Sequence, residues 1–338
     1  MNHSPGRSVD SNQPAKENLQ TRGMGSPPYG ELSFRDGTVN PEQLRQAKEC
    51  LDRDGFLVLR QAFLPSSVET FRHAVQGGPH FIGEWREKFA NGRLSVREVS
   101  NVYLRTPEAR ELLKNSKALD VVSEFLKQSV YLFRDAFISK MPNERSRFPL
   151  HQDSEFWNIQ PEELISLWIP LQKSDRENGV LEVVPGSHKS RYRHVVSVGD
   201  RVVMPQAVNR FLRRGAQNAN TDTPEKVASP ATPGAMFRSF SNWANTKALP
   251  YLSRHFKPFE RFAELFVVEN EVEFWNQTVS VDLDVGDCIV YLSKTIHGSR
   301  GNHSAAERIA YVPTFMGGNY TRDGQIVSDP LLKFHRVL

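Results

Sequence analysis

Two histidines and one aspartate are the residues of this chain with the clearest chemistry. His151 and Asp153 are separated by one residue, and His297 follows far downstream. Two histidines and a carboxylate form the facial ligand set that holds a non-haem Fe(II) and leaves coordination positions open. In an extended segment His151 and Asp153 would point to the same side. The fold then needs to bring up only one more histidine, and the three residues predict an iron site.

An arginine downstream of His297 extends this prediction. Arg308 lies in an apolar segment, residues 307–312, that is typical of a strand. An unpaired charge there would be costly, and the planar fork of a guanidinium pairs bidentately with a carboxylate. We therefore expect Arg308, rather than Arg300, to bind a dicarboxylate co-substrate beside the iron. A zinc hydrolase with the same three ligands would leave Arg308 without a role.

The composition is that of a globular protein. The chain has 338 residues, of which 38% are hydrophobic and 24% charged, enough for one large domain or two small ones. It has no apolar run of membrane-spanning length and no signal-peptide core near its start. Cys50 and Cys288 lie in unrelated contexts and predict no disulfide framework. We expect a cytoplasmic protein that binds no membrane.

Predicted helices come first along the chain, and predicted strands follow. Residues 1–38 are poor in large apolar residues and predict a disordered tail before a single domain, residues 39–338. Asn40-Pro41 is typical of a helix start, and helical spacing recurs at 65–75 and 107–126. Short apolar runs between turn residues then predict strands at 130–137, 139–141, 164–171, 180–184, 279–283, 288–292 and 308–315. This order predicts an α+β fold with a mainly β core and helices packed on it.

A long segment, residues 189–276, interrupts the β pattern and divides the predicted core, at about residues 130–188 and 277–316. A structureless loop of this length is uncommon in a compact domain, so we expect an insertion with its own elements. A helix is predicted after Pro258, with Phe259, Phe262 and Phe266 on one face. That stripe is typical of packing within its own domain, and the alternative is a lid over the active-site mouth.

The insertion begins with a basic stretch. Between residues 189 and 214, seven Lys and Arg residues stand against one Asp, and Arg210, Arg213 and Arg214 are the most compact group. Such a stretch either attracts an anionic substrate or is a solvated face. Only Tyr192 and Phe211 supply aromatic rings there, so stacking on nucleic acid is not favoured.

A second candidate for substrate contact follows the predicted iron ligands directly. Phe156 and Trp157 come three and four residues after Asp153. They would either pack above the metal and meet the substrate, or close the barrel without touching it.

Four segments together resemble a known family. They are residues 54–59 (Asp-Gly-Phe-Leu-Val-Leu), 151–153 (His-Gln-Asp), 178–188 (Asn-Gly-Val-Leu-Glu-Val-Val-Pro-Gly-Ser-His), and 286–308, which holds Gly286-Asp287, His297-Gly298-Ser299 and Arg308. In order and spacing the chain resembles the phytanoyl-CoA dioxygenase family of Fe(II)- and 2-oxoglutarate-dependent oxygenases. The resemblance covers about residues 40–190 and 277–316.

The resemblance implies a double-stranded β-helix, which is a jelly-roll barrel, with the insertion over the active-site mouth. It implies that His151, Asp153 and His297 ligate Fe(II), and that Arg308 pairs with the far carboxylate of 2-oxoglutarate. The reaction would use O2 and release succinate and CO2, with ascorbate as the reductant in vitro.

The resemblance also implies further co-substrate contacts. Lys140 falls near the family position that touches the other end of 2-oxoglutarate, and Gln152 and Trp168 fall at positions that often line its pocket. Many relatives place Ser or Thr two residues after the arginine, where this chain has Ala310. A second hydrogen bond to the carboxylate must then come from elsewhere.

The leading hypothesis is a dioxygenase that hydroxylates, or otherwise oxidises, an unactivated C–H bond of a small molecule in specialised metabolism. One alternative is a nucleic-acid or protein demethylase with the same iron chemistry, and another is a catalytically silent barrel that serves as a binding module. Iron-dependent conversion of 2-oxoglutarate to succinate would separate the last from the other two.

Overall fold

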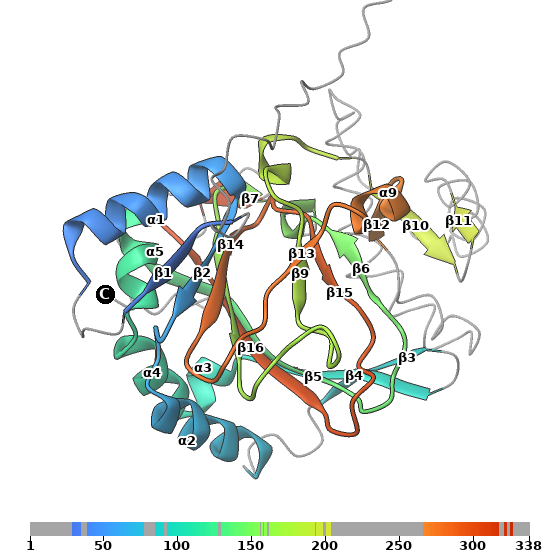
Figure 1. Ribbon diagram of the computed structural model, residues 1–338, viewed down its shortest axis with the longest axis horizontal. Helices are drawn as coiled ribbons and strands as arrows, with labels where there is room; N and C mark the ends of the chain where they lie inside the picture. The colour runs from blue at the N-terminus through green and yellow to red at the C-terminus, as the bar shows by residue number, and fades with distance from the viewer. Residues whose placement is uncertain are drawn as a thin grey trace, which may run out of the picture.

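Two β-sheets face each other at the centre of the molecule, and helices cover the outer face of the larger one (Figure 1). The computed structural model describes residues 29–34, 39–77, 85–90, 93–127, 130–155, 157, 159–160, 162–192, 194–198, 201–203, 266–317, 321–322 and 325–326. The predicted mixture of a large β core with helices packed on it is confirmed.

The larger sheet has eight strands in the order β1-β2-β14-β8-β16-β5-β4-β3. Their bounds are β1 (Glu31–Ser33), β2 (Phe56–Arg60), β14 (Cys288–Leu292), β8 (Ile165–Pro170), β16 (Arg308–Met316), β5 (Tyr131–Lys140), β4 (Arg93–Ser100) and β3 (Arg86–Ala90). β1 pairs with β2 in parallel, and the other neighbours are antiparallel. The strands predicted at 164–171, 288–292 and 308–315 are confirmed, and the two predicted at 130–141 form one continuous strand.

The smaller sheet has the order β13-β9-β15-β6. Its strands are β13 (Val279–Ser280), β9 (Leu181–Val183), β15 (His297–Ser299) and β6 (Phe148–His151). Leu181 and Val183 of this sheet belong to one buried cluster with Phe56, Trp168 and Ile289 of the larger sheet. The space between the sheets is therefore a packed interior, and β6 and β15 bring His151 and His297 to it.

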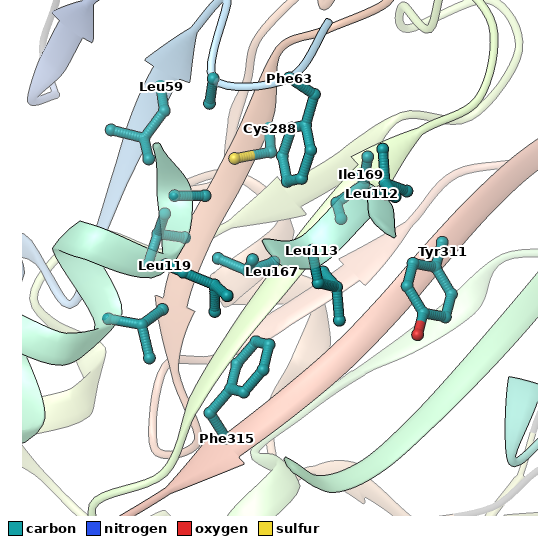
Figure 2. Close-up of a cluster of buried hydrophobic side chains, with 14 of the residues drawn as sticks. Leu59, Phe63, Leu112, Leu113, Leu119, Leu167, Ile169, Cys288, Tyr311 and Phe315 are labelled. Atoms are coloured by element: carbon teal, nitrogen blue, oxygen red, sulfur yellow. The ribbon is translucent and has the colours of Figure 1, made fainter. Parts of the chain in front are cut away.

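Helices cover the other face of the larger sheet. They are α1 (Pro41–Asp54), α2 (Pro65–Gln76), α3 (Val102–Arg105), α4 (Pro107–Lys114) and α5 (Ala118–Leu126). Figure 2 shows Leu112, Leu113 and Leu119 from the helices beside Leu167 and Phe315 from the strands. Each fully buried side chain of this size contributes about 1.5–3 kcal/mol through the hydrophobic effect. This cluster holds the sheet rigid behind the interior.

The local sequence explains where two of these helices end. Asn40 caps α1 by accepting a hydrogen bond from the Gln43 N–H, and Gly55 ends it with a φ of 80°, a conformation that glycine adopts without strain. The single helix predicted over 107–126 is wrong, because α4 stops at Lys114. There Ser116 donates its hydroxyl hydrogen bond to the Leu113 carbonyl, an alternative to continuing the helix.

The predicted disordered tail, residues 1–38, extends too far, because residues near its end are ordered. β1 joins the larger sheet, and Leu32 and Phe34 are buried in the helix-covered cluster. The Phe34 N–H donates to the Arg60 carbonyl at 3.1 Å. Two large apolar residues and a free sheet edge suffice to order this short segment. Residues 1–28 and 35–38 lie outside the described residues.

The insertion has elements of its own, as predicted. β10 (His194–Val198), β11 (Arg201–Val203) and β12 (Phe266–Val268) form a three-stranded sheet, followed by α9 (Glu271–Trp275). Phe266 lies in a strand, so the helix predicted to reach it is wrong at that end, where two valines favour pairing with β10. Phe259, Phe262, Arg210, Arg213 and Arg214 lie outside the described residues, and the lid stays a prediction.

A small sheet completes the description. It pairs β7 (Ile159–Gln160), β17 (Thr321–Arg322) and β18 (Gln325–Ile326). Within the described ranges, no helix has the length and apolar character needed to cross a membrane.

Candidate metal and co-substrate site

The structure brings the three predicted iron ligands together in the interior. His151 ends β6 and His297 begins β15, and the two residues are antiparallel partners. Asp153 opens a short 3-10 turn, so it does not lie in an extended segment as predicted. Its two carboxylate oxygens lie 3.5 Å from His151 Nε2 and 3.7 Å from His297 Nε2. One ligand atom from each of the three buried residues lies within 4.8 Å of the others.

The backbone fixes the orientation of both imidazole rings. His151 Nδ1 lies 2.9 Å from the Pro149 carbonyl, and His297 Nδ1 lies 2.9 Å from the Thr295 carbonyl. A carbonyl only accepts, so each Nδ1 carries the proton and each Nε2 presents a lone pair toward Asp153. Burial, reinforced by the nearby His151, lowers the pKa of His297 to about 4. This ring is therefore neutral near pH 7, as a metal ligand must be.

The carboxylate completes a donor set that suits a divalent metal. Burial alone would raise the pKa of Asp153, but the neighbouring imidazoles of His297 and then His151 outweigh burial and lower it. Asp153 therefore stays an anion beside the two imidazole rings. Two histidines and one carboxylate on one side of a metal leave the remaining positions open for other ligands, which fits a non-haem Fe(II).

Arg308 lies on the same inner face, at the start of β16. Its side chain is 4% exposed, and its guanidinium carbon lies 5.3 Å from the centre of the Trp168 ring. Burial lowers the pKa of Arg308 to about 10, so it remains charged near pH 7. Its Nε is buried with no hydrogen-bond partner, and it forms no ion pair within the part of the chain that the structure describes. A buried, uncompensated guanidinium needs an anion, which is what a bound carboxylate would supply.

Lys140 lies beside Arg308, because the two residues are partners on β5 and β16. Its Nζ donates to Ser299 Oγ at 3.0 Å and to the Arg300 carbonyl. Burial first, and then the charge of Arg308, hold the pKa of Lys140 well below its usual range. The structure places Lys140 at the Arg308 end of the interior rather than at the opposite end, and a co-substrate contact stays a prediction.

Gln152, between two of the metal ligands, is bound on all sides by the chain itself. Its side-chain amide donates to the carbonyls of Ser190 and Lys294, and its side-chain oxygen accepts from the Tyr192 N–H. Its backbone N–H donates to His194 Nε2 at 3.0 Å. Gln152 thus ties the ligand segment to the start of the insertion. A contact with the co-substrate stays a prediction.

The predicted substrate residues have different outcomes. Trp157 is 9% exposed and packs edge-on against Phe133, with ring centres 5.2 Å apart. Phe156, together with the arginines at positions 210, 213 and 214, lies outside the described residues. Their contact with a substrate remains a prediction.

Two interior residues were missed at the sequence level. The Tyr291 ring lies 4.6 Å from the His297 ring, and Arg134 faces the interior from β5. Tyr291 was hidden in an apolar run that correctly predicts a strand. Arg134 carried the signal that identified Arg308, namely a charge inside an apolar strand, and the same reasoning could have found it.

The family of this chain follows from a comparison of sequences. The family described as phytanoyl-CoA dioxygenase (PhyH) matches residues 51–228 and 243–310, more than half of the chain. The matched ranges include His151, Asp153, His297 and Arg308. The chain therefore belongs to the phytanoyl-CoA dioxygenase family, a family of oxygenase enzymes.

Individual relatives share only part of their length with this chain. A probable phytanoyl-CoA dioxygenase of Caenorhabditis elegans is 25% identical over 210 residues, which are 56% of this chain and 64% of that protein. An ectoine dioxygenase of Nocardia farcinica (strain IFM 10152) is 30% identical over 165 residues, 46% of this chain and 53% of that protein. The chain thus spans less than two thirds of these relatives.

The fold extends to solved structures over most of the chain. The epimerase SnoN, in complex with Fe3+, alpha ketoglutarate and nogalamycin RO, matches with a TM-score of 0.54 and 14% identity. The match covers 87% of this chain and 90% of SnoN. At this identity the likeness shows a shared fold alone.

Proposed function

We propose that this protein is an Fe(II)- and 2-oxoglutarate-dependent dioxygenase that hydroxylates an unactivated C–H bond of a small molecule. In this proposal residues 39–338 form one oxygenase domain, and the two facing sheets are a double-stranded β-helix. Specialised metabolism is the setting we favour. It is supported by the named roles of two neighbours, an ectoine dioxygenase and an epimerase of nogalamycin biosynthesis.

One observation carries the proposal. The same interior holds a buried His-Asp-His set and a buried arginine without an anionic partner among the described residues. A hydrolytic metal site has no need for that arginine, and a barrel without ligands would gain nothing from burying it. An iron site with a dicarboxylate co-substrate needs both features.

Each residue has a definite task in this reaction. His151 and His297 would bind the metal through Nε2, and Asp153 supplies the negative charge that favours a divalent metal. Arg308, stacked near Trp168, would orient the far carboxylate of 2-oxoglutarate and neutralise its charge. Fe(II) with bound 2-oxoglutarate supplies the oxidation of the substrate by O2, with succinate and CO2 as products. The surrounding apolar side chains keep water away.

Succinate formation tests the proposal. We expect the protein with Fe(II), 2-oxoglutarate, O2 and ascorbate to form succinate, and to do so faster when a substrate from a small-molecule panel gains one oxygen by mass spectrometry. The matched control is the same mixture with Zn(II) in place of Fe(II). Absence of iron-dependent succinate in any mixture would contradict the proposal and favour a binding module. Succinate formation stimulated only by methylated nucleic acid or protein would favour a demethylase.

A further inference from the structure

A row of polar side chains crosses the inner face of the larger sheet from the metal ligands to Arg134. Neighbouring strands pair Tyr291 with Ser166, Ser166 with Thr314, and Thr314 with Arg134. The Ser166 and Thr314 hydroxyls are 2.9 Å apart. Tyr291, at one end of the row, lies against the ring of His297. Arg134, at the other end, therefore belongs to the interior that contains the candidate iron site.

Arg134 has no anionic partner of its own within the described part of the chain. It takes part in no hydrogen bond or ion pair there, and its guanidinium carbon lies 5.6 Å from the centre of the Trp157 ring. The residue is half-buried. A cation held on an aromatic face beside a metal site is suited to bind an anion.

A local irregularity of β5 lies directly beside Arg134. Thr314 pairs with Arg134 and Phe315 pairs with Leu132, so the register skips Phe133. An extra residue of this kind is a β-bulge, which commonly redirects a side chain next to a functional site. Arg134 points into the interior by the regular alternation of β5, and the skipped Phe133 contacts the same Trp157 ring as Arg134 does. Leu164 and Met316 complete an apolar wall beside the cation.

This position is separate from the one that suits 2-oxoglutarate. Lys140 pairs with Arg308 at one end of the β5–β16 ladder, and Arg134 pairs with Thr314 further along it. Arg308 and Thr314 are six residues apart on β16, a rise of about 20 Å along a strand. One co-substrate at Arg308 therefore leaves Arg134 available for a second anion.

We propose that Arg134 binds the carboxylate or phosphate group of the substrate, while Trp157 and Phe133 pack on an adjoining apolar or aromatic portion. The proposal rests on the proposed function and narrows its substrate class to small organic anions. It is independent of the basic stretch in the insertion.

Binding of simple anions tests the inference directly. The probes are benzoate and phenyl phosphate, with benzamide as the neutral counterpart, and binding is measured by saturation-transfer NMR and calorimetry. The protein carries Mn(II) in place of Fe(II) and a saturating amount of 2-oxoglutarate, so that Arg308 is occupied. The variants are Arg134→Gln and Arg134→Lys. The control is Arg147→Gln, since Arg147 also stacks on a tryptophan, Trp275, at 5.4 Å but is exposed.

The expected result is weaker anion binding in the Arg134 variants and unchanged binding in the Arg147 control. At least one of the two anions should bind the wild type more tightly than benzamide does. Arg134→Gln should raise the Kd for that anion by about tenfold or more, because one charge-assisted hydrogen bond is lost. Arg134→Lys should retain part of the affinity and Arg147→Gln all of it. The preference between benzoate and phenyl phosphate identifies the anionic group.

Three results would overturn the inference, namely no anion binding by the wild type, equal binding by Arg134→Gln, or equal binding of benzamide. Circular dichroism and the melting temperature show whether each variant is folded. Succinate formation by the wild type is measured on the same preparation. Arg134-dependent anion binding without succinate would refute the proposed function alone, and succinate without such binding would refute this inference alone.

Discussion

The two faces of the larger sheet use the same strands for opposite purposes. On β16, Ile309, Tyr311 and Phe315 point to the helices and belong to the apolar cluster of Figure 2. The alternate residues Arg308 and Thr314 point to the interior between the sheets. A strand alternates its side chains between two faces, so one sequence can meet both requirements.

The difference separates stability from function. The outer face stabilises the fold by burying apolar surface, whereas the inner face buries an arginine and a lysine at a cost in free energy. Ligands that bind only the folded state would offset that cost. Changes on the outer face should therefore lower stability and leave metal and co-substrate binding intact. Changes on the inner face should weaken that binding with little loss of stability.

The largest effect should come from removing a metal ligand. His297→Ala should lower iron-dependent succinate formation by more than about 100-fold, because changes even to residues behind a ligand commonly cost about 10–100-fold. Asp153→Gly should act in the same way. The assay is succinate release with saturating 2-oxoglutarate, and the melting temperature without metal serves as the folding control. Near wild-type turnover in either variant would remove that residue from the metal site.

A change on the outer face should have the opposite profile. Leu167→Ala should lower the free energy of unfolding by about 2–5 kcal/mol, the usual cost of a cavity in a core. Urea denaturation measures the loss, and Leu167→Met is the conservative control. One metal per chain should still bind at low temperature. Loss of metal binding in a variant that remains folded would show that the two faces are not separable.

Features that depend on residues close together in the sequence are predictable from it, whereas contacts between distant segments are not. The strand pattern, His151, Asp153, His297 and Arg308 are evident because local periodicity and residue type carry them. The position of Lys140 beside Arg308 is not evident from the sequence, because it depends on the pairing of β5 with β16.

Local sequence also fails where a turn or a bulge decides the direction of a side chain. Asp153 leaves the predicted extended segment for a 3-10 turn, and the register shift beside Arg134 brings Phe133 to the Trp157 ring. The bonds of Gln152 to Ser190 and Lys294 likewise depend on the complete fold.

A moderate effect is expected at Arg308. Arg308→Lys keeps the charge but loses the bidentate fork, and the KM for 2-oxoglutarate should rise by roughly tenfold, as for a lost bond of about 1.5–3 kcal/mol. Arg308→Met should leave the ligand-free protein no less stable in urea, because it removes a buried charge that has no partner. An unchanged KM in Arg308→Lys would assign the carboxylate to another residue.

The smallest effect should come from Gln152. Gln152→Ala removes bonds to three backbone groups and should weaken metal affinity by about tenfold through movement of the ligand segment. At saturating metal the KM for 2-oxoglutarate should be unchanged, and Gln152→Glu should retain the bond to the Tyr192 N–H. A raised KM with normal metal affinity would instead support the predicted direct contact with the co-substrate.

The central claim is that His151, Asp153 and His297 bind one Fe(II) that receives 2-oxoglutarate from the Arg308 side. An anaerobic titration tests it, in which the visible charge-transfer absorption of an Fe(II)–2-oxoacid chelate is recorded as 2-oxoglutarate is added. The account predicts saturation at one iron per chain in the wild type, no band in His297→Ala, and a roughly tenfold shift to higher 2-oxoglutarate in Arg308→Lys. A band of equal strength in His297→Ala, or no band in the wild type, would contradict it.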